Sequence, residues 1–467
     1  MIELPVAEIT KRLKGQLKGP NADSKLPPIS IDSRTLRPGD FFVAIQGKNF
    51  NGHDFIPEAL RVGASGIMHS RDVVDLSLWK DRMFLQVEDT TCALKNLGGY
   101  AREKWGRQLI AISGSMGKTT TREFTATLLK QKYRVFQSPG NLNNEIGVPL
   151  SLLRLKEEDE LAVVELGMNH SGEIRELAKI CQPNWALLTN VAPVHLENFS
   201  DIEEIAASKG EILEALPPKG CFFFNADDSR LTQLARPFEG NKVSFAMENS
   251  AHFQISQFEI QSLQKMSFQL HGKNITLEGT VPFAGKHFLY NVAAAIAVSA
   301  SLGLTEDQIL PALSTLKVPH MRGQVYRFGP NNNNCITLWD DSYNSNPQAM
   351  AMVLETIAQL GYFRRKVLAL GEMLELGKGS VELHRQVGTQ VANCDPDLLV
   401  SVGEKGGYIT EGATESGFPT EKTIQFDNSK EAGHFLARVL ISGDFLLVKG
   451  SRGLEMEKII KAIAEKK

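Results

Sequence analysis

The sequence predicts an α/β protein of three domains: a small N-terminal α/β domain, a central domain with a parallel sheet and appended antiparallel strands, and a C-terminal Rossmann-like α/β domain. Its 467 residues exceed what one ordinary hydrophobic core holds. Strand-like runs alternate with helical segments from about residue 107, and the alternation starts again near Pro319. We therefore expect domains at residues 1–106, 107–318 and 319–467.

The first block predicts two strands with a helix between them. The runs "DFFVAIQG" (residues 40–47) and "ASGIMHS" (64–70) are strand-like, and "FIPEALRVGA" (55–64) has helical spacing. We expect the polar segment "REKWGRQ" (102–108) to form a short bridge into the second block.

The second block predicts a buried strand, "QLIAIS" (residues 108–113), followed by a helix, "TREFTATLLKQKY" (121–133). Turn formers bound three further strand-like runs, at residues 160–167, 184–191 and 220–227. Between about residues 251 and 281 the pattern changes to antiparallel hairpins, and residues 291–303 then predict a helix.

The third block predicts a second doubly wound unit. Its strand-like runs alternate with helices such as "PQAMAMVLETIAQL" (residues 347–360), and "NNNN" (331–334) is expected to be a surface loop. The strand-like runs lie at residues 335–343, 365–373, 397–404 and 444–451.

The composition is that of a water-soluble globular protein, with 42% hydrophobic and 22% charged residues. A net charge of −3 gives no general electrostatic reason to bind nucleic acid or an anionic membrane. The longest apolar stretch, residues 292–304, is too short to span a bilayer. The N-terminus lacks the pattern of a signal peptide, and the cysteines are scattered without a CxxC pair. These features predict a reduced, cytoplasmic protein.

The loop "GSMGKTTT" lies between the first strand and the first helix of the central block. Gly114 and Gly117 let backbone N–H groups point inward at a helix N-terminus, which suits phosphate. Lys118 can reach the outer phosphates, and the hydroxyl of Thr119 can bind the accompanying magnesium ion. The strict pattern has a glycine where this chain has Ile112, so the loop is a shortened phosphate loop. The alternative is a glycine-rich turn that only caps a helix.

Four further clusters of polar residues fall in the same block. Glu165 ends a strand, where a carboxylate commonly meets phosphate-bound magnesium. His195 lies just past the next strand, and Lys209 follows an acidic helix start. His287 and Asn291 lie four apart on one helix face. Taken singly, these residues also fit a structural histidine, a solvated lysine and a helix start with polar caps.

Together, the clusters resemble the Mur ligase family, the ATP-dependent amino-acid ligases of peptidoglycan precursor synthesis. The resemblance extends from about Ser30 to "VKGSRGLEMEK" near the C-terminus. The motifs that carry it are, in order, "GSMGKTTT", "GNLNNEIGVPLSLL", "VELGMNHSGEI", "NVAPVHLENF", "SKGEI", "GKHFLYNVAAA", "MRGQ" and "DDSYNSNP".

The resemblance implies an ATP site, two magnesium sites and a modified lysine. Glu165 and His195 would bind a second magnesium near the γ-phosphate. Lys209 matches the family lysine that is carbamylated, which would make it a metal ligand beside Thr119. Lys118, Lys209 and His287 would be the catalytic residues. The ATP-binding set would be Gly114, Ser115, Gly117, Lys118, Thr119, Thr120, Asn291, Arg322 and Asp341.

The resemblance also implies the substrates. Ser33 and Arg34 match the uridine-diphosphate site, and the third-domain motifs "DDSYNSNP", "GEMLELG" and "VKGSRG" are similar to those of the member that adds D-alanyl-D-alanine (D-Ala-D-Ala). The partners would be UDP-N-acetylmuramoyl-tripeptide and D-Ala-D-Ala, joined through an acyl phosphate by a monomeric enzyme. One departure is Phe288, where many members have Asn.

Two other functions are weighed against this one. The first is another Mur-type ligase that adds the third peptide residue, which "DDSYNSNP" disfavours. The second is a non-catalytic nucleotide-binding homologue, which the presence of Lys118, Glu165, His195, Lys209 and His287 disfavours. A phosphate-loop switch or motor protein would leave the flanking domains and the "GKHFLYN" motif without a role.

Overall fold

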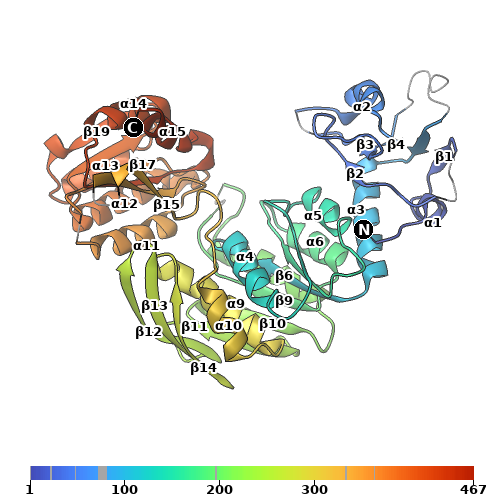
Figure 1. Cartoon of the computed structure of the whole chain (residues 1–467), viewed down its shortest axis with the longest axis horizontal. Coiled ribbons are helices and arrows are strands. Elements are labelled where there is room, and N and C mark those ends of the chain that lie inside the picture. Colours follow the sequence, from blue (N-terminus) through green and yellow to red (C-terminus); the bar gives the residue numbers. More distant parts are fainter. Residues whose placement is uncertain are drawn as a thin grey trace.

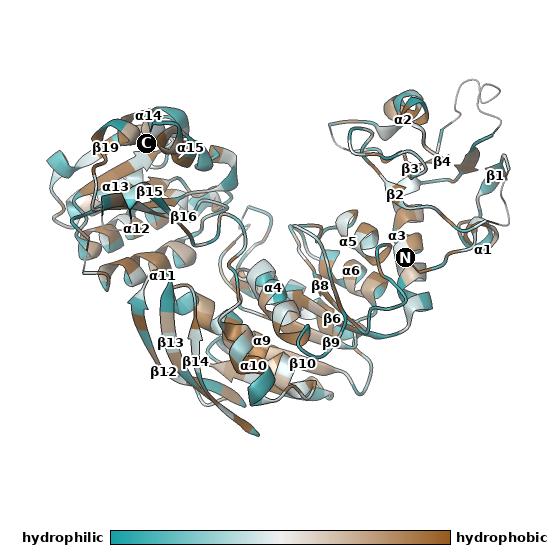
Figure 2. Cartoon of the chain, in the orientation of Figure 1, coloured by the Kyte–Doolittle hydropathy of each residue, from teal (hydrophilic) through white to brown (hydrophobic). Residues whose placement is uncertain are grey.

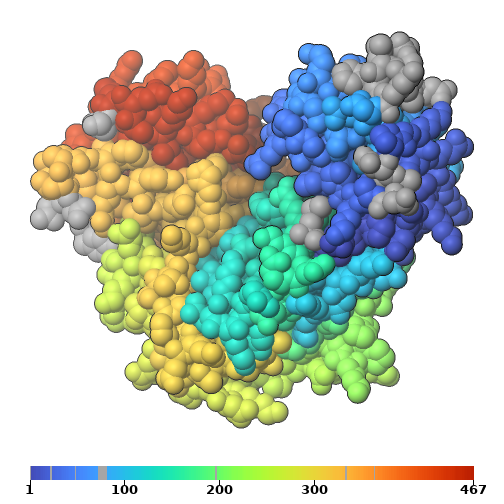
Figure 3. Space-filling view, turned by 45° about the vertical axis from the view of Figure 1, so that its right-hand side comes forward, coloured from blue at the N-terminus to red at the C-terminus, as the bar shows by residue number. Residues whose placement is uncertain are grey.

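The computed structural model describes residues 2–20, 24–47, 49–71, 81–194, 197–331, 334–361 and 363–466. The chain forms three α/β units in sequence order, and the first and third units lie on the same side of the central one (Figure 1). In the space-filling view the N-terminal and C-terminal units both lie above the central unit (Figure 3). The predicted α/β fold class is confirmed.

The N-terminal unit has a five-stranded sheet in the order β1-β5-β4-β3-β2. Among the described strands of this sheet, β1 pairs antiparallel with β5 and the other pairings are parallel. Its elements are α1 (Val6–Arg12), β1 (Gln16–Lys18), β2 (Ile29–Ser30), β3 (Phe41–Val43), α2 (Ile56–Val62), β4 (Gly66–His69), β5 (Met83–Gln86) and α3 (Thr90–Trp105).

The central unit has a nine-stranded sheet in the order β14-β13-β12-β11-β10-β9-β6-β8-β7. The pairings from β7 to β12 are parallel, and the hairpins β12–β13 and β13–β14 are antiparallel, as predicted. Its elements are β6 (Gln108–Ser113), α4 (Lys118–Leu129), β7 (Val135–Gln137), α5 (Gly147–Leu152), β8 (Leu161–Glu165), α6 (Glu173–Cys181), β9 (Trp185–Leu188), α7 (Ile202–Gly210), β10 (Cys221–Asn225), α8 (Ser229–Ala235), β11 (Asn241–Ala246), β12 (Phe253–Ser262), β13 (Lys265–Gly272), β14 (Ile275–Val281), α9 (Lys286–Ser301) and α10 (Glu306–Leu313).

Helices cover both faces of the central sheet because its strands are apolar on both sides. In β6, Ile110 and Ile112 belong to the core shared with α4, α9 and α10, whereas Leu109 and Ala111 belong to the core shared with α5 to α8. Figure 2 shows this as hydrophobic colour along the strands and in α9.

The C-terminal unit has a six-stranded sheet in the order β15-β16-β20-β17-β18-β19, in which, over the described residues, β15 pairs antiparallel and the other strands pair parallel. Its elements are β15 (Gln324–Asn331), β16 (Asn334–Asp341), α11 (Pro347–Ala358), β17 (Arg365–Gly371), α12 (Ser380–Cys394), β18 (Leu398–Val402), α13 (Gly407–Glu415), β19 (Thr423–Phe426), α14 (Ser429–Val439), β20 (Asp444–Lys449) and α15 (Glu457–Lys466).

Two predicted connections differ from the structure. Residues 102–105 of the expected polar bridge are the last turn of α3, where Trp105 is buried and Arg102 donates from Nε to the carbonyl of Cys181 at 2.7 Å. The expected surface loop at residues 331–334 has Asn331 and Asn334 as exposed, paired strand ends of the β15–β16 hairpin, and residues 332 and 333 lie outside the described residues. Both differences arise because polar residues also occur in the last turn of a helix and at strand ends.

Candidate active site

The loop after β6 turns tightly at its two glycines. Gly114 and Gly117 have φ angles of 141° and 76°, which strongly favour glycine. A Cβ on Gly114 would lie 1.9 Å from Thr189 Oγ1, and one on Gly117 would lie 2.4 Å from Asn291 Oδ1. The loop therefore leads directly into the N-terminus of the 12-residue helix α4, whose first N–H groups have no partner within the helix.

Lys118 begins α4 and folds back over this loop. Its Nζ donates to the carbonyl oxygens of Gly114 at 2.8 Å and Ser115 at 3.1 Å. Burial lowers the pKa of Lys118, the carboxylate of Glu165 raises it, and the charge of Arg322 lowers it. The Lys118 side chain is thus held beside the open end of the loop. Thr119 and Thr120 follow it in the sequence.

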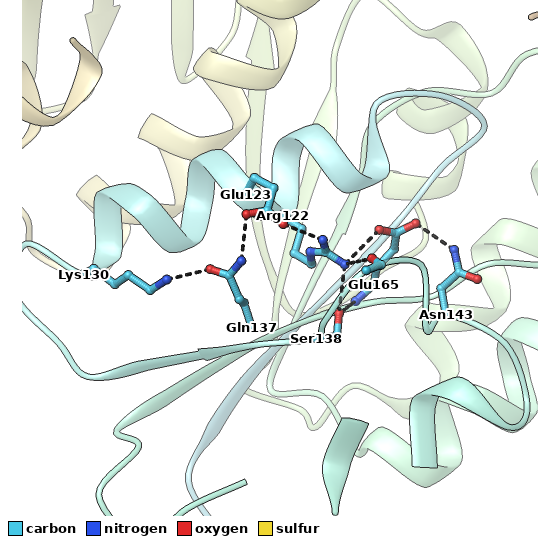
Figure 4. Close-up of polar contacts among 8 residues, drawn as sticks. Arg122, Glu123, Lys130, Gln137, Ser138, Asn143 and Glu165 are labelled. Atoms are coloured by element: carbon cyan, nitrogen blue, oxygen red, sulfur yellow. Dashed lines mark hydrogen bonds and ion pairs between the residues drawn. The ribbon is translucent and has the colours of Figure 1, made fainter. Parts of the chain in front are cut away.

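Glu165 ends β8 on the same edge of the sheet and is 1% exposed. Its Oε1 accepts from Asn143 Nδ2 at 2.8 Å, and its Oε2 lies 3.4 Å from Arg122 Nη1 (Figure 4). Sequence reasoning missed both partners. Asn143 lies in the quoted motif "GNLNNEIG", so a signal for it was present, whereas Arg122 carried none.

Lys209 lies in the last turn of α7 and is 3% exposed. Burial, and then the charge of Lys118, lower the pKa of Lys209 well below its ordinary value. Both effects favour the neutral form of this amine. Its side chain is not among those that line the cleft described below.

His195, another predicted metal ligand, lies outside the described residues. Within the described ranges, no group of three or more His, Cys, Asp or Glu side chains is placed to hold a metal ion. The predicted metal set also includes Thr119 and Lys209, which are of other residue types.

The helix α9 begins at Lys286 and contains both His287 and Asn291, and Asn291 lies against Gly117 of the phosphate loop. Asn291 Oδ1 accepts from Thr121 Oγ1 at 3.0 Å. Burial lowers the pKa of His287 to about 4, with Asp341 raising it and Lys449 lowering it. Because these two modifiers belong to the C-terminal unit, His287 lies where the central and C-terminal units meet.

Phe288, the departure from the family pattern, is buried at the same place. Its ring centroid lies 5.1 Å from that of Phe283, and it packs directly against Gly323, where a Cβ would lie 2.7 Å from its ring. Phe288 therefore supplies an apolar contact between α9 and the start of the C-terminal unit.

The C-terminal unit contributes a charged wall. Asp341 Oδ2 lies 2.6 Å from Lys449 Nζ, a lysine only 3% exposed that also donates to the carbonyl of Asn344 at 3.1 Å. The guanidinium of Arg322 lies 3.9 Å from the ring centroid of Tyr343. The predicted residues Arg322 and Asp341 thus lie together, and Lys449 and Tyr343 are additions from the structure.

A second polar cluster lies at the same N-terminal end of α9, around Tyr290. Asp227 accepts backbone N–H groups from Met247, Glu248 and Asn249, and it accepts from Tyr290 Oη at 3.0 Å. These residues were not predicted, although Asp227 lies two residues past the end of β10, close to the kind of strand-end position at which Glu165 was predicted.

These walls enclose one cleft of about 750 Å³ between the central and C-terminal units. Its lining is mostly polar, with both charge signs present, as suits a nucleotide and an anionic substrate. The predicted residues that line it are Ser115, Gly117, Lys118, Thr119, Thr120, Glu165, His287, Asn291, Arg322 and Asp341.

Ser33 and Arg34 are not part of this cleft. Ser33 Oγ donates to Glu58 Oε2 at 2.8 Å. Arg34 pairs with Asp32 through two hydrogen bonds of 2.9 and 2.7 Å, and its side chain is 83% exposed. The arginine side chain lowers the pKa of Asp32. These residues form a separate polar surface on the N-terminal unit.

Three family models match the chain in order. The Mur ligase family, catalytic domain, matches residues 27–95, the Mur ligase middle domain matches 112–299, and the Mur ligase, glutamate ligase domain matches 324–452. The chain belongs to the Mur ligase family, as its motifs predicted.

Individual relatives are similar over their whole length. The UDP-N-acetylmuramoyl-tripeptide–D-alanyl-D-alanine ligase of Escherichia coli (strain K12) is 35% identical, covering 100% of this chain and 99% of the relative. The protein of the same name from Bacillus subtilis (strain 168) is 30% identical, with the same coverage.

Solved structures give the same result. A crystal structure of MurF from Acinetobacter baumannii matches with a TM-score of 0.88 at 30% identity, covering 99% of each chain. The MurF ligase of Thermotoga maritima, solved in complex with ADP, matches with a TM-score of 0.81 at 28% identity over 94% of this chain and 98% of that one.

Proposed function

We propose that this chain is an ATP-dependent ligase that joins D-Ala-D-Ala to UDP-N-acetylmuramoyl-tripeptide, giving the pentapeptide, ADP and phosphate in peptidoglycan precursor synthesis. The observation that carries this is the cleft, where a phosphate loop faces a charged wall of the C-terminal unit. The names of the full-length relatives support the choice of substrates.

The residues present fit ATP with magnesium. The backbone N–H groups of Ser115 and Met116 already donate to Asn190, so the N–H groups for phosphate are those of the first turn of α4, from Lys118 to Thr120. Thr119 and Glu165 offer the oxygen donors that Mg²⁺ prefers. His195 would add a ligand of a second magnesium. When bound, magnesium neutralises phosphate charge and polarises the transferred phosphoryl group.

Lys209 fits the carbamylation that the family resemblance implies. Only a neutral amine adds carbon dioxide, and the burial of Lys209 beside Lys118 favours that form. The product would be a carbamate, whose carboxylate oxygens are able to bind metal.

The chain's own side chains then favour transfer of phosphate to the substrate carboxylate. Lys118 places positive charge beside the outer phosphates, and Arg322 approaches from the facing wall. His287 is neutral near pH 7 because its pKa is about 4, so it acts as a hydrogen-bonding partner of the reacting groups. The dipeptide amine attacks the resulting acyl phosphate, and closure of the cleft excludes water that would hydrolyse it.

The three units would divide the substrates. We assign residues 1–106 to the UDP-sugar-peptide, with Ser33 and Arg34 at the uridine diphosphate, 107–318 to ATP and 319–467 to the dipeptide. Within the part of the chain that the structure describes, no helix is long and apolar enough to cross a membrane. We place this enzyme in the cytoplasm as a monomer, acting without nucleic acid.

Phosphate release from ATP tests the function. We expect release to require both UDP-N-acetylmuramoyl-tripeptide and D-Ala-D-Ala, with a pentapeptide product identified by mass spectrometry. Release with UDP-N-acetylmuramoyl-dipeptide and a free amino acid, but not with the tripeptide and D-Ala-D-Ala, would favour the ligase that adds the third residue. No stimulation by any substrate would favour a non-catalytic nucleotide-binding protein.

A further inference from the structure

A buried arginine lies directly behind the carboxylate that ends β8. Arg122 is in the second turn of α4, and both its side chain and that of Glu165 are 2% exposed. Arg122 Nη1 lies 3.4 Å from Glu165 Oε2 (Figure 4). Glu165 is among the side chains that line the cleft, and Arg122 is not. Arg122 therefore meets Glu165 from the protein side.

The guanidinium is fixed by several acceptors. Nη1 donates to the carbonyl of Gly140 at 2.6 Å and to Ser138 Oγ at 3.4 Å, and Nη2 donates to Glu123 Oε1 at 2.6 Å. Swinging Arg122 away from Glu165 would break these bonds together. The positive charge is therefore a permanent part of the environment of Glu165.

Glu165 is held from its other side as well. Asn143 Nδ2 donates to Oε1 at 2.8 Å, and the backbone N–H of Glu165 donates to Ser138 Oγ at 3.2 Å. Each carboxylate oxygen retains a further lone pair for a ligand in the cleft. The carboxylate is thus oriented, and the positive charge of Arg122 lies beside its negative charge, before any ligand binds.

We propose that Arg122 is a positioning residue that acts through Glu165, as a resident counter-charge that makes divalent-cation binding depend on nucleotide. This inference rests on the proposed function, in which Glu165 is a magnesium ligand. The guanidinium repels a second cation at the same carboxylate, so the cation binds weakly alone. The phosphates of a nucleotide add negative charge, and the cation then binds with them.

The test measures Mn²⁺ binding to the full-length protein by electron paramagnetic resonance, with and without ADP. The unmodified protein should bind Mn²⁺ weakly alone and tightly with ADP. Arg122→Gln should raise the ADP-free affinity on the order of tenfold, because the repulsion is removed. Arg122→Lys, which keeps the charge, should restore much of the dependence on ADP.

Lys130→Gln is the matched control. It removes a positive charge just beyond α4, where Lys130 Nζ donates to Gln137 Oε1 at 2.7 Å, and Lys130 does not line the cleft. Both Mn²⁺ affinities should stay at their unmodified values. If Arg122→Gln does not fold, the double variant Arg122→Gln/Glu123→Gln takes the place of that single variant in the same measurements. It removes the arginine together with Glu123, the carboxylate to which Arg122 Nη2 donates.

An unchanged ADP-free Mn²⁺ affinity in a folded variant would overturn the inference and leave Arg122 with a structural role. Failure of the unmodified protein to bind Mn²⁺ even with ADP would overturn the proposed metal site itself. The two failures are distinguishable because the second occurs without any substitution.

Discussion

The two junctions between the units of this chain are built in opposite ways. Between the N-terminal and central units, α3 is continuous, and its Leu97 shares one apolar cluster with Leu150 and Leu153 around α5. Gly98 allows α3 to approach so closely that a Cβ there would lie 2.6 Å from Pro149 Cα. Between the central and C-terminal units lies the polar cleft.

The apolar contacts at the second junction are more local. Leu263, at the turn of the β12–β13 hairpin, packs into the apolar cluster of the C-terminal unit, and Phe288 packs against Gly323. A shared core resists relative motion of two domains, whereas a polar interface permits it. The first junction therefore holds a domain in place, and the second leaves polar groups available for ligands.

Lys118→Ala should have the largest effect on turnover. It should disturb the cleft at the second junction and leave the first junction unchanged. Removing one preorganised charge from the transferred phosphate should lower kcat on the order of 10²–10³-fold or more. Steady-state phosphate release measures this loss. Circular dichroism should show an unchanged fold, and retention of full turnover would mean that the phosphate loop does not hold ATP.

Lys209→Ala should lower turnover on the order of 10²-fold or more, because a metal ligand is lost. Added short carboxylates such as formate or acetate should restore part of the rate by taking the place of the carbamate. The rate is measured against carboxylate concentration. Full activity without added carboxylate would show that Lys209 is not carbamylated for catalysis.

Leu97→Ala should weaken the first junction by about 2–5 kcal/mol, the cost of a cavity in a packed core. Urea unfolding measures the change in the free energy of unfolding. The matched control is Leu374→Ala, which truncates a leucine that is 41% exposed beside the cleft. That change should stay within about 0.5 kcal/mol, and equal effects would contradict the contrast between the junctions.

Acid should weaken the protein through His287. Its pKa is about 4 when folded and 6.5 ordinarily, so between these values the unfolded chain binds a proton that the folded chain does not. The free energy of unfolding should therefore fall as pH drops from 6.5 to 4, by up to about 1.4 kcal/mol per pH unit from this group. His287→Gln should flatten that slope in urea titrations at several pH values. An equal slope in the variant and the unmodified protein would contradict the contribution assigned to His287.

Lys95→Gln should have the smallest effect. The residue forms a 2.6 Å ion pair with Glu145 at the first junction, where the two side chains are 29% and 61% exposed. Exposed pairs contribute about 0–1 kcal/mol. Urea unfolding at low and high salt should show a change within that range, and a larger loss would mean that the first junction depends on charge.

The sequence predicted the α/β class and the candidate residues that line the cleft because these depend on local patterns and on ordered motifs. Apolar runs such as residues 108–113 predicted strands. The glycines between the strand and the helix predicted a tight loop at a helix N-terminus. Lys449 and Asp341 lie 108 residues apart in the sequence and meet because β16 and β20 are neighbours in the sheet. No local pattern encodes such a contact.

The errors concern residues whose polarity conceals burial. Arg102 is buried because it donates to the end of α6, and Arg122 because Gly140 and Glu165 accept from it. Single-sequence reasoning places arginine on the surface by default. Only the three-dimensional partners show that one arginine joins two units and the other faces the proposed metal site.

The most direct test of the account is transfer of oxygen from substrate to phosphate. UDP-N-acetylmuramoyl-tripeptide carrying ¹⁸O in the carboxylate that becomes the new amide is incubated with ATP and D-Ala-D-Ala. Formation of an acyl phosphate predicts one ¹⁸O atom in each phosphate released, as measured by mass spectrometry. Pentapeptide formation with unlabelled phosphate would contradict the acyl-phosphate mechanism assigned to this cleft.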